Sequence, residues 1–276
     1  MTSPEFRDFC GFMPWFNEII VDSRAGFWNL AAALMVWRQI NRGWDVIVDM
    51  QCSQRTNRYF SFFNHRETRW VGTAVGCTDP VPNFTDVNNQ TRMIITARLA
   101  GGKDSVAKME WLSKSKIAYP RELVDLNIGP YVVLAPGCST AKPQKRWPAK
   151  RFAALANMFD KKDYTVILTG TEADRNAVEE VKSIAQNVID FCQKTNLSDL
   201  CDLLYHADFV VGNDSGPVFL AAKAGVPTLM VMGPDTNPKM SAPIGAKASW
   251  LRANPIDLIT EFEAFNEFRR LSRLKG

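Results

Sequence analysis

The chain has 276 residues, of which 46% are hydrophobic and 22% are charged, and its formal net charge is +4. These values match a soluble globular protein and exclude a disordered or fibrous chain. At roughly 150 residues per domain, the length fits about two domains. The small positive charge suits an anionic ligand or contact with a membrane surface, and it is too weak for a nucleic-acid-binding protein.

The cysteines and the apolar segments indicate the cellular compartment in which the protein is expected to work. The 6 cysteines are scattered and form no CxxC pair, so the pattern predicts neither a disulfide framework nor a zinc site. The opening residues, MTSPEFRDF, carry acids and lack the apolar core of a signal peptide. The longest apolar stretch, residues 27–37, is too short to span a bilayer. We therefore expect a protein of the cytoplasm.

The first part of the chain predicts an α/β unit. In chain order we expect a strand at 18–22, a helix at 26–40, a buried strand at 45–49, a helix at 55–63 and a short strand around Trp70. Residues 77–102 are rich in Pro, Asn and Thr and predict a long loop, and a helical pattern resumes at 103–116. The segment LNIGP at 126–130 contains Gly and Pro, which are typical of a turn, and it precedes the next strand. We place the domain boundary in this region, with a first domain at 1–118 and a second at 119–276.

The second part alternates strands and helices more regularly. The expected elements are strands at 131–136, 164–170, 188–191, 208–214 and 227–233, and helices at 148–160, 172–186, 197–206, from Gly216 and from about Pro255. The strand at 227–233 is expected to be the last. The final helix carries an apolar stripe of Leu258, Phe262, Phe265, Phe268 and Leu271. Apolar strands that alternate with helices predict a parallel sheet covered on both faces.

Polar side chains follow the first strand of this sheet, at the edge where open α/β folds bind ligands. Gly137 permits close backbone approach, the hydroxyls of Ser139 and Thr140 can donate hydrogen bonds, and Lys145 supplies a cation. Together they predict an anion site. An ordinary solvated surface loop is the alternative that the residues leave open.

Two further strand ends are polar. Glu172 follows the second strand, where a carboxylate can accept the hydroxyls of a ribose or simply favour the first turn of a helix. Asp214, Ser215 and Gly216 follow the fourth strand and open a helix, whose N–H groups and dipole suit a pyrophosphate. Asp214 or Ser215 can also cap that helix, and the two roles are compatible.

Several common motifs do not occur. The sequence holds no GxGxxG, no GxxxxGK[ST], no GxSxG and no HExxH. No two aspartates are spaced as DxD, which argues against a metal-chelating diphosphate site of that kind.

Three sequence segments are similar to those of a known family: APGCSTAKPQKRWPAKRFAALA, VILTGTEADRNAV and ADFVVGNDSGPVFLAAKAGVPTLMVMGP. They resemble glycosyltransferase family 9, the lipopolysaccharide heptosyltransferases. The resemblance implies an α/β, GT-B-like fold of two Rossmann-like domains with parallel sheets. Residues 1–118 would form the acceptor-side domain, and 119–276 the nucleotide-sugar-binding domain with a C-terminal helix. The first part is similar to the latter half of the family's acceptor-side domain, so we expect that domain to be incomplete at its N-terminus.

The resemblance also implies an activity. The family transfers a sugar, typically the heptose of ADP-heptose, to a lipid A–Kdo-type or other saccharide acceptor, with inversion and without a metal or other cofactor. The enzyme would work at the cytoplasmic face of the bacterial inner membrane, with peripheral membrane contact and no nucleic-acid partner. Its implied donor residues are Ser139, Thr140 and Lys145 for the diphosphate, Glu172 for the ribose, Asp214 for the sugar, and Ser215 and Gly216 for phosphate.

The catalytic residues are implied in the same way. Lys145 and the helix start would stabilise the charge that develops on the leaving phosphate, while Asp214 engages the sugar. The family's aspartate base belongs to a glycine-rich loop that should precede residue 18, and nothing corresponds to it. Asp22 or Asp49 can stand in, and we prefer Asp49 because the polar segment Gln51-Cys52-Ser53 follows it.

A second departure concerns the donor pocket, because Phe219 stands where many members have a histidine. The missing base and Phe219 together leave a second hypothesis open, a nucleotide-sugar-binding protein of the same fold without transferase activity. A third, a sugar-nucleotide epimerase, needs more ionisable groups in the cleft than the sequence offers.

Overall fold

The computed structural model describes residues 1–26, 28–63, 68–82, 84–103, 129–138, 143–185 and 187–274. The chain divides into two compact units, Met1–Lys108 and Met109–Gly276. The boundary expected at 118/119 and nearly all of the helix expected at 103–116 fall on 104–128, outside the described residues, and both stay predictions. Among the helices of the described part, none has the length and apolar content that crossing a membrane requires.

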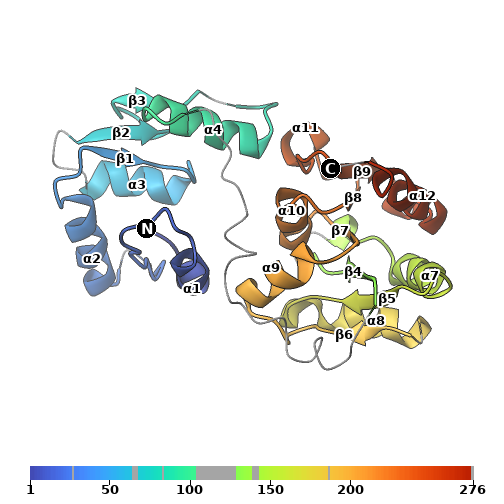
Figure 1. Ribbon diagram of the computed structural model, residues 1–276. Coiled ribbons are helices and arrows are strands. Elements are labelled where there is room, and N and C mark those ends of the chain that lie inside the picture. Colours follow the sequence, from blue (N-terminus) through green and yellow to red (C-terminus); the bar gives the residue numbers. More distant parts are fainter. Residues whose placement is uncertain are drawn as a thin grey trace. The chain divides into compact units, whose positions relative to one another are not determined.

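The first unit contains a small parallel sheet with helices beside it (Figure 1). In chain order its elements are η1 (Pro4–Phe6), α1 (Arg7–Gly11), α2 (Leu30–Ile40), β1 (Val46–Val48), α3 (Gln54–Phe63), β2 (Arg69–Gly72), β3 (Asp79–Pro80) and α4 (Asn89–Leu99). The strand order is β1-β2-β3, and both pairings are parallel. Its core gathers Val36 and Ile40 of α2, Tyr59 of α3 and Trp70 of β2.

Two predictions for this unit are wrong. The segment expected to be a strand at 18–22 forms no strand. Among the described residues its ladder pairing is a single parallel bridge, between Val21 and Thr2. The loop expected at 77–102 contains β3 and α4. Its Asn and Thr residues look like loop formers, but Asn88 caps the helix by accepting a hydrogen bond from the Gln90 N–H at 3.0 Å.

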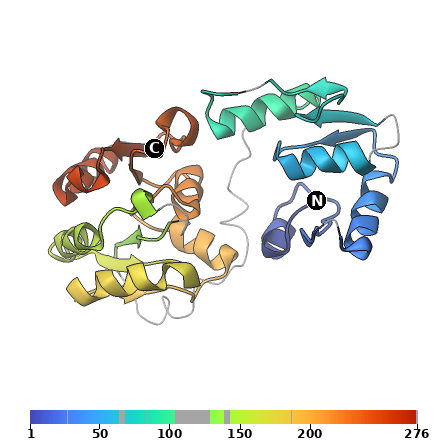
Figure 2. The ribbon, with the colours of Figure 1, turned by 180° about the vertical axis from the view of Figure 1, so that it is seen from behind.

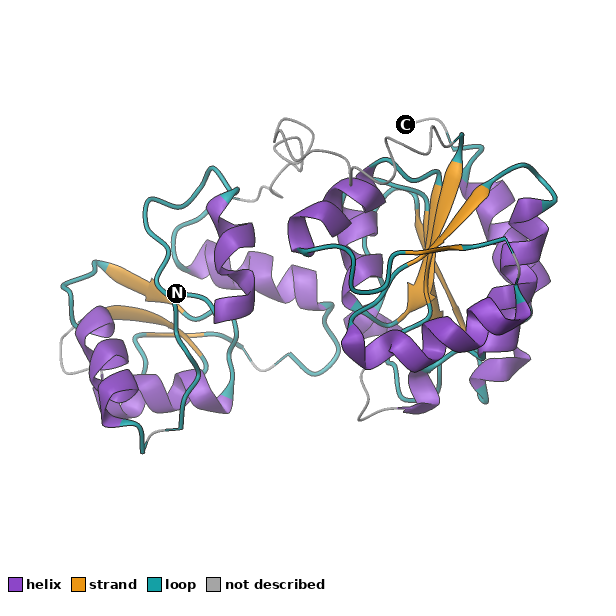
Figure 3. Ribbon diagram, turned by 90° about the horizontal axis from the view of Figure 1, so that it is seen from below, coloured by secondary structure: helices purple, strands orange, loops and turns teal. Residues whose placement is uncertain are grey.

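The second unit is built on a six-stranded parallel sheet in the order β6-β5-β4-β7-β8-β9. Its strands are β4 (Tyr131–Ala135), β5 (Thr165–Leu168), β6 (Ile189–Asp190), β7 (Phe209–Asn213), β8 (Thr228–Met232) and β9 (Ala248–Arg252). Numbered from β4, this is the order 3-2-1-4-5-6 of dinucleotide-binding folds. Figure 3 shows the strands of this sheet fanned between helices.

Helices cover both faces of the larger sheet. The helical elements are η2 (Pro143–Lys145), α7 (Ala149–Asp160), η3 (Glu172–Asp174), α8 (Arg175–Ile184), α9 (Leu197–Tyr205), α10 (Gly216–Lys223), α11 (Pro238–Ser241), η4 (Ile256–Leu258) and α12 (Glu261–Leu271). Residues of α7, α8 and α12 form one buried cluster with the sheet, and residues of α9 and α10 form another. Figure 2 shows α12, α7 and α8 in a row along one face. The predicted doubly covered sheet is confirmed.

Two details of the second unit differ from prediction. β8 is not the last strand, because β9 pairs with it in parallel. The segment ASWLR escaped recognition because β9 is an edge strand whose residues are half-buried or exposed, which removes the continuous apolar run. The predicted stripe of the last helix is also partly wrong: Leu258 and Phe262 are each 63% exposed, whereas Phe268 and Leu271 are buried. The helix starts only at Glu261, behind a capping box of Thr260 and Glu263.

Candidate functional site

The larger sheet has its topological switch point between β4 and β7. These strands are hydrogen-bonded neighbours, and the chain leaves β4 toward β5 on one side and β7 toward β8 on the other. In such sheets the crevice for a ligand opens beyond the carboxyl ends of the two strands. The segment from Pro136 follows β4 here, and Asp214 follows β7.

Asn213, the last residue of β7, ties these segments together. It is fully buried, and its Nδ2 donates to the carbonyls of Pro136 at 2.8 Å and Gly137 at 3.2 Å. Its Oδ1 accepts a hydrogen bond from the Trp147 N–H at 2.8 Å. One amide therefore fixes the ends of both switch-point strands and the segment that follows η2.

Lys145 and Asp214 meet at this point. The Lys145 Nζ forms a hydrogen-bonded ion pair with the Asp214 Oδ2, and the two side chains are only 15% and 9% exposed. The hydroxyl of Thr236 donates to the same carboxylate oxygen at 3.1 Å. The pair places a cation and a carboxylate side by side, 69 residues apart in sequence, at the mouth of the switch point.

The start of α10 lies directly beyond Asp214. Ser215 occupies the N-cap position, but its side chain makes no cap hydrogen bond and its hydroxyl instead donates to the Asn213 carbonyl at 3.3 Å. Space around Gly216 is open, because a Cβ placed there meets no atom within 4 Å. Pro217 has no N–H and the Val218 N–H donates to the Ser215 carbonyl at 3.2 Å, so the Gly216 N–H and the helix dipole are what favour an anion at this start.

Glu172 lies beyond β5, in the 3-10 turn η3, and is exposed. Asp174 of the same turn accepts hydrogen bonds from the N–H and the hydroxyl of Thr171, at 3.0 and 2.8 Å. The Asp174 side chain packs against Gly137, where an added Cβ would lie 2.1 Å from its Cγ. The ends of β4 and β5 thus approach each other closely because residue 137 is glycine.

We expect Gly137→Ala to lower the free energy of unfolding by about 1–3 kcal/mol, because the new methyl group forces Asp174 out of its capping box. Chemical denaturation measures the loss. Gly216→Ala is the matched control, since it adds the same methyl group into open space. Equal stability of the two variants would contradict the close approach.

Two predicted donor residues, Ser139 and Thr140, lie outside the described residues. Their roles stay predictions. Phe219, on the body of α10, is 38% exposed.

The two aspartates considered as a base both belong to the first unit. Asp22 is engaged: its Oδ2 accepts a hydrogen bond from the Tyr59 hydroxyl at 2.6 Å, and Arg55 lies 3.8 Å away. Burial and the bond to Asp22 raise the pKa of Tyr59 to about 12. Asp49 follows β1 and is 6% exposed; its Oδ1 accepts from the N–H groups of Gln51 and Cys52 at 3.0 and 2.9 Å.

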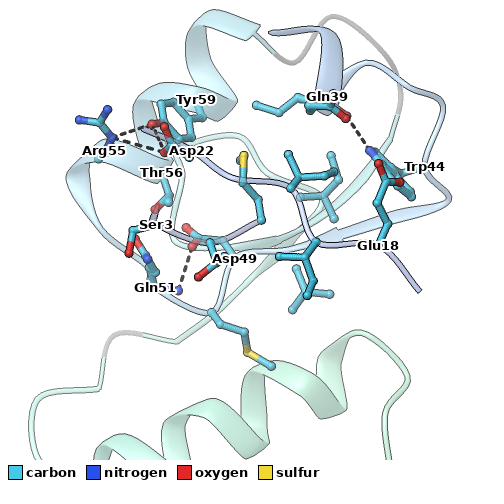
Figure 4. A pocket seen from close by; sticks show the side chains of 18 of the residues that line it. Ser3, Glu18, Asp22, Gln39, Trp44, Asp49, Gln51, Arg55, Thr56 and Tyr59 are labelled. Atoms are coloured by element: carbon cyan, nitrogen blue, oxygen red, sulfur yellow. Dashed lines mark hydrogen bonds and ion pairs between the residues drawn. The ribbon is translucent and has the colours of Figure 1, made fainter. Parts of the chain in front are cut away.

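Asp49 differs from Asp22 in its second oxygen. The Asp49 Oδ2 has no hydrogen-bond partner among the described residues, and Asp49 lines a cavity of about 540 Å³ within the first unit (Figure 4). Of the two candidates, Asp49 therefore has a carboxylate oxygen without a partner in the described part of the chain, and that oxygen is itself buried.

Sequence reasoning missed three residues that shape the switch point: Asn213, Asp174 and Thr236. An asparagine that ends a buried apolar strand is a signal for Asn213, and Thr171-x-x-Asp174 is a capping-box pattern. Thr236 had no local signal, because it reaches Asp214 from the segment after β8.

The chain was compared with known proteins. The family model described as "Glycosyltransferase family 9 (heptosyltransferase)" matches residues 94–269. The lipooligosaccharide heptosyltransferase 2 of Haemophilus influenzae is 34% identical over 135 residues, which cover 47% of this chain and 38% of that relative. The match thus spans about two fifths of the relative's length.

Solved structures share the fold. A family 9 glycosyltransferase from Veillonella parvula matches with a TM-score of 0.82 and 21% identity, covering 98% of this chain and 87% of that one. The E. coli heptosyltransferase WaaC, solved with ADP-2-deoxy-2-fluoro heptose, matches with a TM-score of 0.74 and 14% identity over 97% and 88%. These likenesses and the parallel sheets confirm the predicted α/β, GT-B-like fold class. The chain belongs to glycosyltransferase family 9.

Proposed function

We propose that this chain transfers a heptose from ADP-heptose to a lipopolysaccharide core saccharide, with inversion and without a metal. The observation that carries the proposal is the Lys145–Asp214 pair at the switch point of a 3-2-1-4-5-6 sheet, beside the open start of α10. The E. coli relative solved with an ADP-sugar analogue supports the choice of donor. We propose a cytoplasmic location with peripheral contact to the inner membrane.

The proposed donor site follows from charge. The diphosphate accepts hydrogen bonds from Lys145 and from the Gly216 N–H at the start of α10, with Ser139 and Thr140 as further donors. Glu172 accepts hydrogen bonds from the ribose hydroxyls. As the bond to the sugar breaks, negative charge grows on the β-phosphate. A preorganised ammonium group and a helix start stabilise that charge where it develops, so the chemistry needs no metal.

Asp214 and Asp49 have different proposed roles. Asp214 orients Lys145 and contacts a sugar hydroxyl with the carboxylate oxygen that the ion pair leaves available. Asp49 accepts the proton of the attacking acceptor hydroxyl, since its Oδ2 has no partner within the described part of the chain.

A transfer assay tests this function. The chain is incubated with ADP-heptose and a heptose-free lipid A–Kdo acceptor in the presence of a chelator, and mass spectrometry follows the acceptor. We expect a gain of one heptose residue, and an anomeric configuration opposite to that of the donor. ADP-heptose binding without any transfer would instead favour the non-catalytic nucleotide-sugar-binding protein.

A further inference from the structure

The turn that follows β8 reaches the Lys145–Asp214 pair from a third segment of the chain. Its first residue, Gly233, lies so close to η2 that an added Cβ would stand 2.5 Å from the Gln144 carbonyl oxygen. Thr236 closes the turn, since its N–H donates to the Gly233 carbonyl at 3.3 Å, and it is only 2% exposed. The close contact at Gly233 therefore brings a buried hydroxyl to the ion pair.

The Thr236 hydroxyl and the Lys145 ammonium group bond to the same oxygen of Asp214. Lys145 reaches the Asp214 Oδ2 from the segment after β4, and Thr236 reaches it from the segment after β8 with a hydrogen bond of 3.1 Å. Hydrogen bonds to a carboxylate oxygen lie near the plane of the group, so two donors at one oxygen fix the orientation of that plane. Both bonds fall on Oδ2, which leaves Oδ1 as the oxygen that can meet a ligand.

Arg252 holds the turn from the other side. It lies at the end of the edge strand β9, where its Nε donates to the Thr236 carbonyl at 3.1 Å and its Nη2 to the Pro234 carbonyl at 3.0 Å. The planar guanidinium presents both donors in a fixed fork, which the single ammonium group of a lysine does not reproduce. An exposed arginine thus fixes the backbone that carries the Thr236 hydroxyl.

The second bond to Asp214 becomes important when a donor binds. In the proposed function the Lys145 ammonium group turns N–H donors toward the diphosphate, and these donors are then lost to Asp214. A carboxylate held by Lys145 alone would be free to rotate at that moment. The Thr236 hydroxyl is fixed by the turn, so it keeps its bond to Oδ2 and keeps Oδ1 directed at the ligand.

We propose that Thr236 is a positioning residue for the sugar of the donor and that Arg252 acts through Thr236. Thr236 orients the Asp214 carboxylate toward a sugar hydroxyl, and Arg252 holds Thr236 in place. The inference rests on the proposed function, because it takes Asp214 to contact the donor sugar. It predicts that recognition of the sugar, and not recognition of the nucleotide, depends on both residues.

The test compares ADP-heptose with ADP as ligands of Thr236→Val, which keeps the β-branched shape and removes the hydroxyl. We expect calorimetry to show ADP-heptose binding about tenfold weaker and ADP binding changed by less than about twofold. The transfer rate kcat should fall about tenfold as well. Thr236→Ser restores the hydroxyl, and it should bring the ADP-heptose affinity and kcat back to within about threefold of the unchanged chain.

A double-mutant cycle shows whether Arg252 acts through Thr236. Arg252→Lys alone should weaken ADP-heptose binding about threefold or more. The same exchange should cause almost no further loss in Thr236→Val, because the contact through which it acts is already gone. Arg269→Lys, at an exposed position of α12, is the matched control and should leave the affinity for both ligands unchanged.

Three results would overturn the inference. They are an unchanged ADP-heptose affinity in Thr236→Val, equal losses for ADP and ADP-heptose in that variant, and losses that simply multiply in the double variant. The unchanged chain separates the inference from the proposed function. If it binds ADP-heptose but transfers no heptose, the proposed transfer fails while the affinities still test Thr236. If it does not bind ADP-heptose, both fail.

Discussion

Replacing Lys145 with alanine is expected to weaken ADP binding by about 2–5 kcal/mol, roughly 30-fold or more. The substitution removes the ammonium group proposed to meet the diphosphate. It also leaves the 9% exposed carboxylate of Asp214 without its cation, so that carboxylate repels the ligand. Isothermal titration calorimetry with ADP measures the effect, and circular dichroism checks the fold.

The control for this prediction is Lys150→Ala, which removes one positive charge from an exposed position on α7 of the same unit. If both variants lose affinity equally, the loss reflects net charge and the assigned site is wrong. Asp214→Asn separates the two partners. It removes a negative charge near the diphosphate, so ADP binding should persist while sugar transfer falls with the loss of the sugar contact.

Replacing Asn213 with alanine is expected to lower the free energy of unfolding by about 3–5 kcal/mol. The variant leaves the carbonyls of Pro136 and Gly137 and the N–H of Trp147 without their buried partner. Urea denaturation followed by tryptophan fluorescence measures the loss. ADP binding should also weaken, because the hydrogen bonds that join the end of β7 to the segment after β4 are lost.

Asn187→Ala is the matched control for Asn213→Ala. Asn187 is exposed, and its Nδ2 donates to the Asp160 carboxylate at 3.1 Å. Its loss should cost about 0.5 kcal/mol or less, as is usual for surface positions. Comparable losses in the two variants would show that burial of the Asn213 amide does not stabilise the switch point.

The strands that position the site could be predicted from sequence because they are continuous apolar runs. β4 and β7 are buried along their whole length, and so their residues are nearly all hydrophobic. β9 could not be recognised in the same way, since an edge strand keeps exposed positions such as Trp250. α4 was missed because its Asn and Thr residues favour loops, whereas in the structure the Asn88 side chain caps its first turn.

The meeting of Lys145 and Asp214 follows from topology, because both residues come after neighbouring strands of one parallel sheet. The sequence does not reveal that a third side chain also bonds to the Asp214 carboxylate. Thr236 reaches Asp214 from a third segment, and the position of that segment depends on how β8 packs. For Asp49, a polar segment after a strand was a usable signal, whereas the lack of a partner for its Oδ2 among the residues that the structure describes is a property of the fold.

A crystal structure of the chain with bound ADP tests the central claim most directly. We predict that the diphosphate lies within hydrogen-bond distance of the Lys145 Nζ and of the first turn of α10, with the ribose at Glu172. ADP bound away from the β4–β7 switch point, with the Lys145–Asp214 pair unchanged and the start of α10 empty, would contradict the account.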